Sequence, residues 1–161
     1  MKKNIESILN KQVNNEYYSS YLYLSMAAYF ESTNLSGLAH WMKKQSQEEL
    51  VHTMKIFDHL VNRDARVQLM KIDAPQLKWK SPLDAFQNAL KHEKLVSSQI
   101  NKIFGLAKKE KEHPTEILMH WFIEEQVEEE DSANKIVEQL KLIGSSKNGL
   151  LMLDKELAKR E

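Results

Sequence analysis

Glu49 and His52 are three residues apart in the sequence and could bind one metal ion together. On a helix this spacing puts both side chains on one face, with Cβ atoms about 5–6 Å apart. The pair alone is a weak signal, because Glu-x-x-His also occurs on solvated helix faces. Here, however, both residues are in register with an apolar stripe that includes Leu38, Met42 and Ile56. A carboxylate inside such a stripe needs a partner or a bound ion.

Three more glutamates, Glu16, Glu93 and Glu129, interrupt apolar stripes in the same way. A buried ion-pair network does not explain them, because no stripe carries Lys or Arg near its centre. Unpaired carboxylates in an apolar interior are costly, and bound cations remove that cost. Four carboxylates with one imidazole favour iron or manganese over structural zinc, and carboxylates in this number favour two ions. Gln126, one turn before Glu129, could help through its amide or a water molecule.

Further polar and aromatic residues surround these acids. Glu48, Glu125 and Glu128 could form a third, more exposed metal site, but an acidic run of this kind is equally typical of a solvated helix face. Tyr23 lies on the same face of its helix as the first glutamate, and Trp121 lies one turn before Glu125. Each aromatic side chain could simply be part of the core, or it could take part in redox chemistry beside the acids.

The acids are positioned by long helices. Helical periodicity is present at about residues 5–32, 37–62, 82–107 and 113–143, and a short apolar helix follows at about 147–159. The first two are joined by a short turn, which predicts an antiparallel hairpin with Ser36 as the N-cap of the second helix. Residues 64–81 have no helical spacing and are long enough to cross the bundle, which would set the third helix parallel to the second. Ser81, Pro82 and Asp84 predict the start of that third helix.

The composition excludes several classes of function. The formal net charge is zero, which argues against nucleic acid or an anionic membrane as a partner. The chain has no cysteine, so disulfides, iron–sulfur clusters and thiolate zinc sites are excluded. There is no run of about 18 apolar residues and no apolar signal segment at the N-terminus. We therefore expect a cytoplasmic protein that does not enter a membrane.

The motifs that carry the acids resemble those of the non-haem ferritins of bacteria and archaea. They are NEYYSS at 15–20, QEELVH at 47–52, KHEK at 91–94 and EEQVEEE at 124–130, and the likeness covers nearly the whole chain. The resemblance implies an all-α fold: one ferritin-like domain over residues 1–161, with the four-helix bundle at about 4–143. A long crossover would join the second and third helices, and a short fifth helix would end the chain. The resemblance also implies a shell of 24 subunits that oxidises Fe(II) with oxygen or peroxide and stores the ferric mineral.

The same resemblance assigns roles to individual residues. The first iron site matches Glu16, Glu49 and His52; the second matches Glu49 as a bridge with Glu93 and Glu129, and with Gln126 nearby; the third matches Glu48, Glu125, Glu128 and Glu129. Tyr23 matches a tyrosine beside the centre, and Trp121 a neighbouring tryptophan. Leu50 stands where haem-binding relatives have a methionine ligand, so we expect two irons per subunit, a third iron beside them and no haem.

Two other classes of function remain open. One is a diiron oxidase or peroxidase that uses the same bundle without storing iron. The other is a non-catalytic helical interaction module, which gives no account of four glutamates at matching depths. The apolar tail from Leu150 to Leu157 separates a cage from a monomeric oxidase, because the pore of a cage needs it and a monomer does not.

Overall fold

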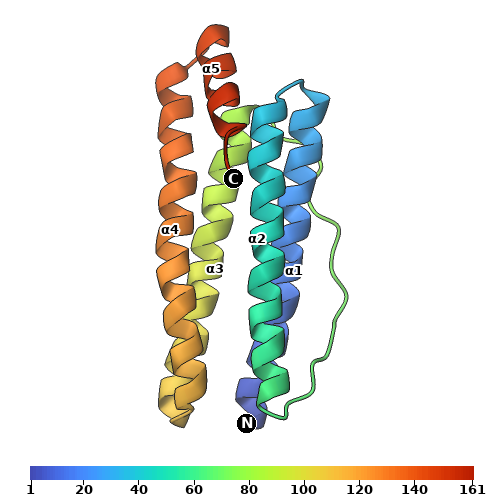
Figure 1. The fold of residues 1–161 in the computed structure, drawn as a ribbon, viewed down its shortest axis with the longest axis vertical. Helices are drawn as coiled ribbons and strands as arrows, with labels where there is room; N and C mark the ends of the chain where they lie inside the picture. Colours follow the sequence, from blue (N-terminus) through green and yellow to red (C-terminus); the bar gives the residue numbers. More distant parts are fainter.

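The computed structural model describes all 161 residues and contains five helices and no strand. The helices are α1 (Lys3–Ser32), α2 (Ser36–Asn62), α3 (Pro82–Glu110), α4 (His113–Ile143) and α5 (Lys147–Leu157). Figure 1 shows the four long helices side by side, with α5 folded back over one end of the bundle. This confirms the predicted all-α bundle with a short fifth helix. None of the helices combines the length and the apolar character needed to cross a membrane.

The segment between α2 and α3, residues 63–81, runs along the outside of the bundle from one end to the other (Figure 1). As a result α2 and α3 are parallel, as the length of the segment predicts. The side chain of Asn10 on α1 holds the segment: it donates to the Arg66 carbonyl at 3.0 Å and accepts from the Gln68 amide at 2.6 Å. The Trp79 side chain is buried near the end of the segment. The crossover is therefore held to its own bundle near both ends, while Leu69 and Leu77 between them are exposed.

Two helix starts show how local and distant residues satisfy free backbone amides. At α3, Ser81 is the N-cap as predicted, and its hydroxyl accepts from the Asp84 amide at 3.1 Å. At α2 the prediction is wrong, because Ser36 lies inside the helix and makes no capping hydrogen bond. Instead the Asp154 carboxylate of α5 accepts from the Leu38 amide at 2.9 Å. A residue that is distant in sequence thus replaces the local cap.

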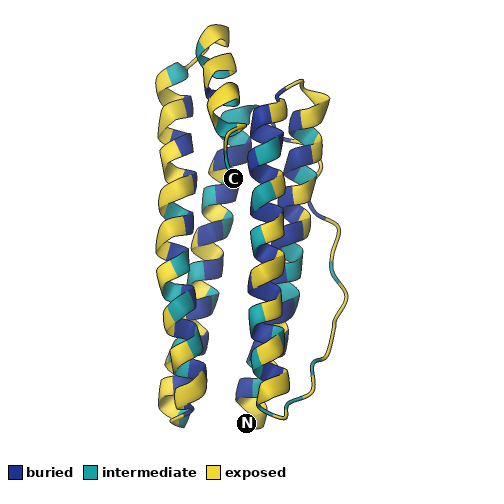
Figure 2. Cartoon of the chain, viewed as in Figure 1, coloured by how far each residue is buried: buried dark blue, intermediate teal, exposed yellow.

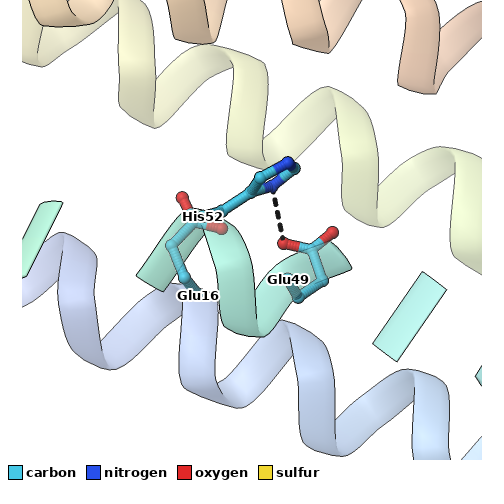
Figure 3. Close-up of side chains that lie close together, drawn as sticks. All are labelled: Glu16, Glu49 and His52. Atoms are coloured by element: carbon cyan, nitrogen blue, oxygen red, sulfur yellow. Dashed lines mark ion pairs between the residues drawn. The ribbon is translucent and has the colours of Figure 1, made fainter. Parts of the chain in front are cut away.

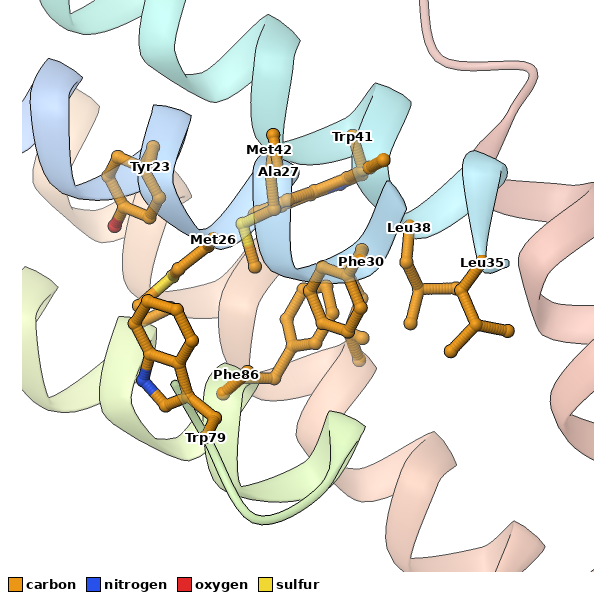
Figure 4. Packing of buried hydrophobic residues seen from close by; sticks show 14 of the residues in the cluster. Tyr23, Met26, Ala27, Phe30, Leu35, Leu38, Trp41, Met42, Trp79 and Phe86 are labelled. Carbon is orange, nitrogen blue, oxygen red and sulfur yellow. The ribbon is translucent and has the colours of Figure 1, made fainter. Parts of the chain in front are cut away.

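The core consists of two apolar clusters with a polar layer between them. The first contains Phe30, Met42 and Phe86 and fills the end of the bundle near α5 (Figure 4). The second contains Leu9 and Ile56 and fills the opposite end. Figure 2 shows the buried residues on the facing sides of the four long helices. Along each helix, the polar residues of the layer fall between the segments that build the two clusters.

Helix α5 packs on its own bundle through only one of its sides. Leu153 is buried, and Leu150 and Leu157 pack against the first apolar cluster. Leu151 and Met152 are 52% and 72% exposed. The bundle therefore leaves an apolar side of this helix uncovered.

Candidate metal centre

Each long helix contributes one glutamate to the polar layer between the apolar clusters. Glu16, Glu49 and Glu93 are almost completely inaccessible to solvent, and Glu129 is only 8% exposed. None of the buried residues of the chain is Lys or Arg. The four acids thus meet in the interior without a cationic side chain among them, an arrangement that is costly unless they are protonated or bind cations.

Glu16, Glu49 and His52 form the tightest group in this layer. One ligand atom from each residue lies within 4.8 Å of the other two, and His52 Nδ1 is 3.3 Å from Glu49 Oε2 (Figure 3). Glu16 Oε2, Glu49 Oε2 and His52 Nδ1 are all buried and have no hydrogen-bond partner. Buried polar atoms are normally paired, so an unpaired atom on each of three residues whose ligand atoms cluster this closely fits a bound cation.

Glu93 and Glu129 complete the layer from α3 and α4. Glu93 accepts from the Tyr23 hydroxyl and, at 3.0 Å, from the Gln126 amide. Glu129 accepts from the Gln45 amide at 2.6 Å. An ionised carboxylate has about four lone-pair positions, so these donors orient both groups and still leave lone pairs for a cation. Both side chains can therefore still accept a cation, but Glu93 is in neither of the two groups whose ligand atoms lie within 4.8 Å of one another.

The residues expected at a third site are only partly brought together. Ligand atoms of His52, Glu125 and Glu129 lie within 4.8 Å of one another, with His52 Nε2 3.8 Å from Glu125 Oε2. Glu128 is exposed on α4 and belongs to neither group. Glu48 is half-buried and forms an ion pair with the side chain of Arg160 at 2.5 Å.

The layer strongly perturbs the acidity of its carboxyl groups. Burial raises the pKa of Glu16 well above its ordinary value, and the nearby charge of Glu49 adds to this. Burial and then the charge of Glu93 raise the pKa of Glu49. The same two causes raise the pKa of Glu129 to about 7. In the absence of metal the layer therefore retains protons near neutral pH, and a binding cation would displace them.

Two aromatic residues border the layer. Tyr23 is buried, and burial followed by the charge of Glu93 raises the pKa of its hydroxyl well above the ordinary value, so it remains a proton donor. The Trp121 ring stands edge-on to His52, with ring centres 5.5 Å apart. The Lys55 ammonium lies 4.0 Å from the centre of the Trp121 ring. Both aromatic side chains thus reach residues of the candidate centre.

Two glutamines of the layer had no role in the sequence-based hypothesis. Gln12 donates to Glu16 Oε1 at 2.8 Å, and Gln45 donates to Glu129. Each lies four residues before a layer glutamate on its own helix, Gln12 before Glu16 and Gln45 before Glu49. That spacing was available as a signal, because residues four apart share a helix face. The hydrogen bond from Gln45 to Glu129 on α4, by contrast, is visible only in the folded structure.

Comparisons with known proteins agree with this architecture. A family model described as a ferritin-like domain matches residues 6–143. A bacterial non-heme ferritin of Bacteroides fragilis is 38% identical over 156 residues, which cover 97% of each chain. The corresponding protein of Staphylococcus haemolyticus is 34% identical over 99% of this chain and 96% of its own. An open pore ferritin of the hyperthermophilic archaeon Archaeoglobus fulgidus superposes with a TM-score of 0.99 at 46% identity, covering 100% of this chain and 99% of the other.

Proposed function

The chain belongs to the ferritin family, whose function is iron storage, and on this premise we propose that its polar layer is a ferroxidase centre. The centre would oxidise Fe(II) to Fe(III) before the iron is stored as a mineral. The main support is the close grouping of Glu16, Glu49 and His52, each with a buried and unpaired polar atom, in a layer that contains no cationic side chain. Oxygen- and nitrogen-containing ligands of this kind suit iron.

The geometry suggests how two Fe(II) ions would be held. The first would bind to Glu16, Glu49 and His52, the three residues with unpaired ligand atoms. The second would bind to Glu93 and Glu129, with Glu49 as the bridge between the ions. The amide of Gln126 stays beside this second position and keeps Glu93 oriented.

The proposed reaction balances with two iron ions and one molecule of oxidant. Two Fe(II) ions each lose one electron, and oxygen takes up both electrons and two protons to give hydrogen peroxide. When peroxide is the oxidant, the same two electrons and two protons give two molecules of water. The buried layer supports this chemistry because it holds both ions in one place away from bulk water.

A third ion is proposed next to the pair, at the outer side of the layer. Glu125 and Glu129 converge there with His52. Glu48 and Glu128 are the remaining proposed ligands, and both would need to turn toward the ion. We propose that this position accepts iron after the first two positions are filled.

Substitution of Glu49 by Ala tests the centre directly. The variant should lose rapid Fe(II) oxidation by at least about a hundredfold, because it removes a ligand of both ions. Its helix content should be kept, since Ala has a higher helix propensity than Glu. Stopped-flow absorbance after mixing with Fe(II) and oxygen measures the rate, and circular dichroism checks the fold. Glu138→Ala, which removes an exposed acid of α4, is the matched control and should oxidise iron at the wild-type rate.

We also propose that the chain assembles into a closed shell of 24 subunits. The exposed Leu151 and Met152 on α5 support association through this helix, because a folded monomer would leave them in water. Repetition of one contact around symmetry axes would close the shell. Light scattering of the purified protein gives its mass, and a monomer or dimer at micromolar concentration would contradict the proposal.

A further inference from the structure

The C-terminal tail is fixed to α2 at a point where the two backbones nearly touch. A Cβ atom on Gly37 would lie 1.7 Å from the backbone oxygen of Asp154. Only glycine leaves room for this approach, and the Asp154 side chain then accepts from the Leu38 amide. This contact sets the position of the residues that follow α5.

Arg160, the second-last residue, lies against α2 and contacts several groups of that helix. Its guanidinium forms an ion pair with Glu48 at 2.5 Å and donates to Gln45 Oε1 at 3.0 Å and to the Trp41 carbonyl at 3.3 Å. It also lies 4.5 Å from the centre of the Trp41 ring. The Arg160 carbonyl is 2.6 Å from Nε2 of His40. These contacts keep one cationic group at the edge of the carboxylate layer.

Through Gln45 the guanidinium also acts on Glu129. A guanidinium has donors and no acceptor, so the atom of Gln45 that faces Arg160 must be the amide oxygen. The amide nitrogen is therefore turned toward Glu129, to which it donates at 2.6 Å. Arg160 thus contacts Glu48 directly. It also orients the amide of Gln45, which donates to Glu129 across the bundle.

We propose that Arg160 is a tethered cation that competes with the third metal ion for Glu48. This inference rests on the proposed function, because it concerns the third position next to the two-iron centre. A metal ion that takes Glu48 as a ligand requires this carboxylate to turn toward it, and the turn draws Glu48 away from the guanidinium. Docking of the tail and binding of the third ion therefore exclude each other, and the third ion binds more weakly than the carboxylates alone would allow.

A calorimetric titration of the metal-free assembled protein with Zn(II) tests the competition between Arg160 and the third metal ion without iron oxidation. Arg160→Ala should bind the third Zn(II) per subunit roughly two- to fivefold more tightly, the size expected for a partly exposed ion pair. The first two equivalents should be unchanged. Arg160→Lys keeps the charge and should stay closer to the wild type. Lys159→Ala removes a charge from the same tail but pairs only with exposed Glu156, so it should match the wild type.

Hydrogen exchange of residues 147–161 in the wild-type protein provides a second readout. The tail should exchange faster when the third equivalent of Zn(II) is added, and no faster with the first two. Third-site binding that is unaffected by Arg160→Ala, with a tail that stays protected, would overturn the inference. Weaker binding of the first two equivalents in Arg160→Ala would also overturn it, because Arg160 would then support the centre and not compete with it. If the wild type fails to bind even two Zn(II), the proposed two-ion centre fails instead.

Discussion

Substitution of Glu129 by Gln should remove a pH-dependent loss of stability from the metal-free protein. Burial, followed by the charge of Glu93, raises the pKa of the Glu129 carboxyl from its ordinary 4.5 to about 7. Between these two values the folded state retains a proton that the unfolded state has released. The stability that this proton provides is therefore complete below about pH 4.5 and is lost as the pH rises through about 7.

The size of the effect follows from the two pKa values. The interval from 4.5 to about 7 corresponds to about 3 kcal/mol per subunit, at roughly 1.4 kcal/mol for each pH unit. The hydrogen bond from Gln45 lowers the pKa of Glu129 and so opposes part of the effect of burial. Glutamine at position 129 keeps the size of the side chain and an oxygen for the Gln45 amide, but has no proton to release.

The assay compares the free energies of unfolding of the chelator-treated wild type and Glu129→Gln at about pH 5 and about pH 7.5. This range covers most of the titration of Glu129. Titration of groups remote from the layer is common to both proteins, so the difference between the two pH dependences reports on Glu129 and on the neighbouring acids that its charge affects. The wild type should lose about 2 kcal/mol more than the variant over this range, because part of the full effect lies outside it. Addition of Zn(II) near neutral pH should restore the stability of the wild type more than that of the variant.

Parallel pH dependences in the two proteins would refute this reasoning. They would mean that Glu129 ionises in the folded protein as readily as in water, and hence that the layer is hydrated or already neutralised. A stability difference that is independent of pH would show only that glutamine packs differently at this position.

Three further predictions concern the outer site, the tail and its assembly. Glu128→Ala should leave oxidation of the first two irons per subunit intact and alter later turnover, which stepwise iron titration measures; loss of the first two equivalents would place Glu128 in the main centre. Gly37→Ala should lower the melting temperature, because its Cβ would meet the Asp154 backbone and overpacking costs about 1–3 kcal/mol. Gly105→Ala is the control, because a Cβ at this position meets nothing within 4 Å, and this variant should have a slightly higher melting temperature than the wild type. Deletion of residues 148–161 should leave a helical bundle by circular dichroism but weaken the assembly seen by light scattering; an equally heat-stable, full-size particle would exclude the tail as an assembly element.

The helices and the depth of their acids follow from the sequence alone. Apolar stripes repeat every three or four residues within each helix, so the position of Glu16 or Glu93 in its stripe is a local property. The length of the segment before Ser81 similarly predicts a crossover and a parallel pair of helices. The structure places the four glutamates in one buried layer, while their individual roles as metal ligands remain predictions.

The tertiary structure alone decides which distant groups satisfy each other. No local pattern shows that Asp154 caps α2, that Gly37 is needed for close packing against the tail, or that Arg160 pairs with Glu48. These partners are separated by more than a hundred residues and meet only because α5 folds back over the bundle. Periodicity determines which face of a helix is buried, but the contact made at each point of that face depends on how neighbouring helices are placed along and around it.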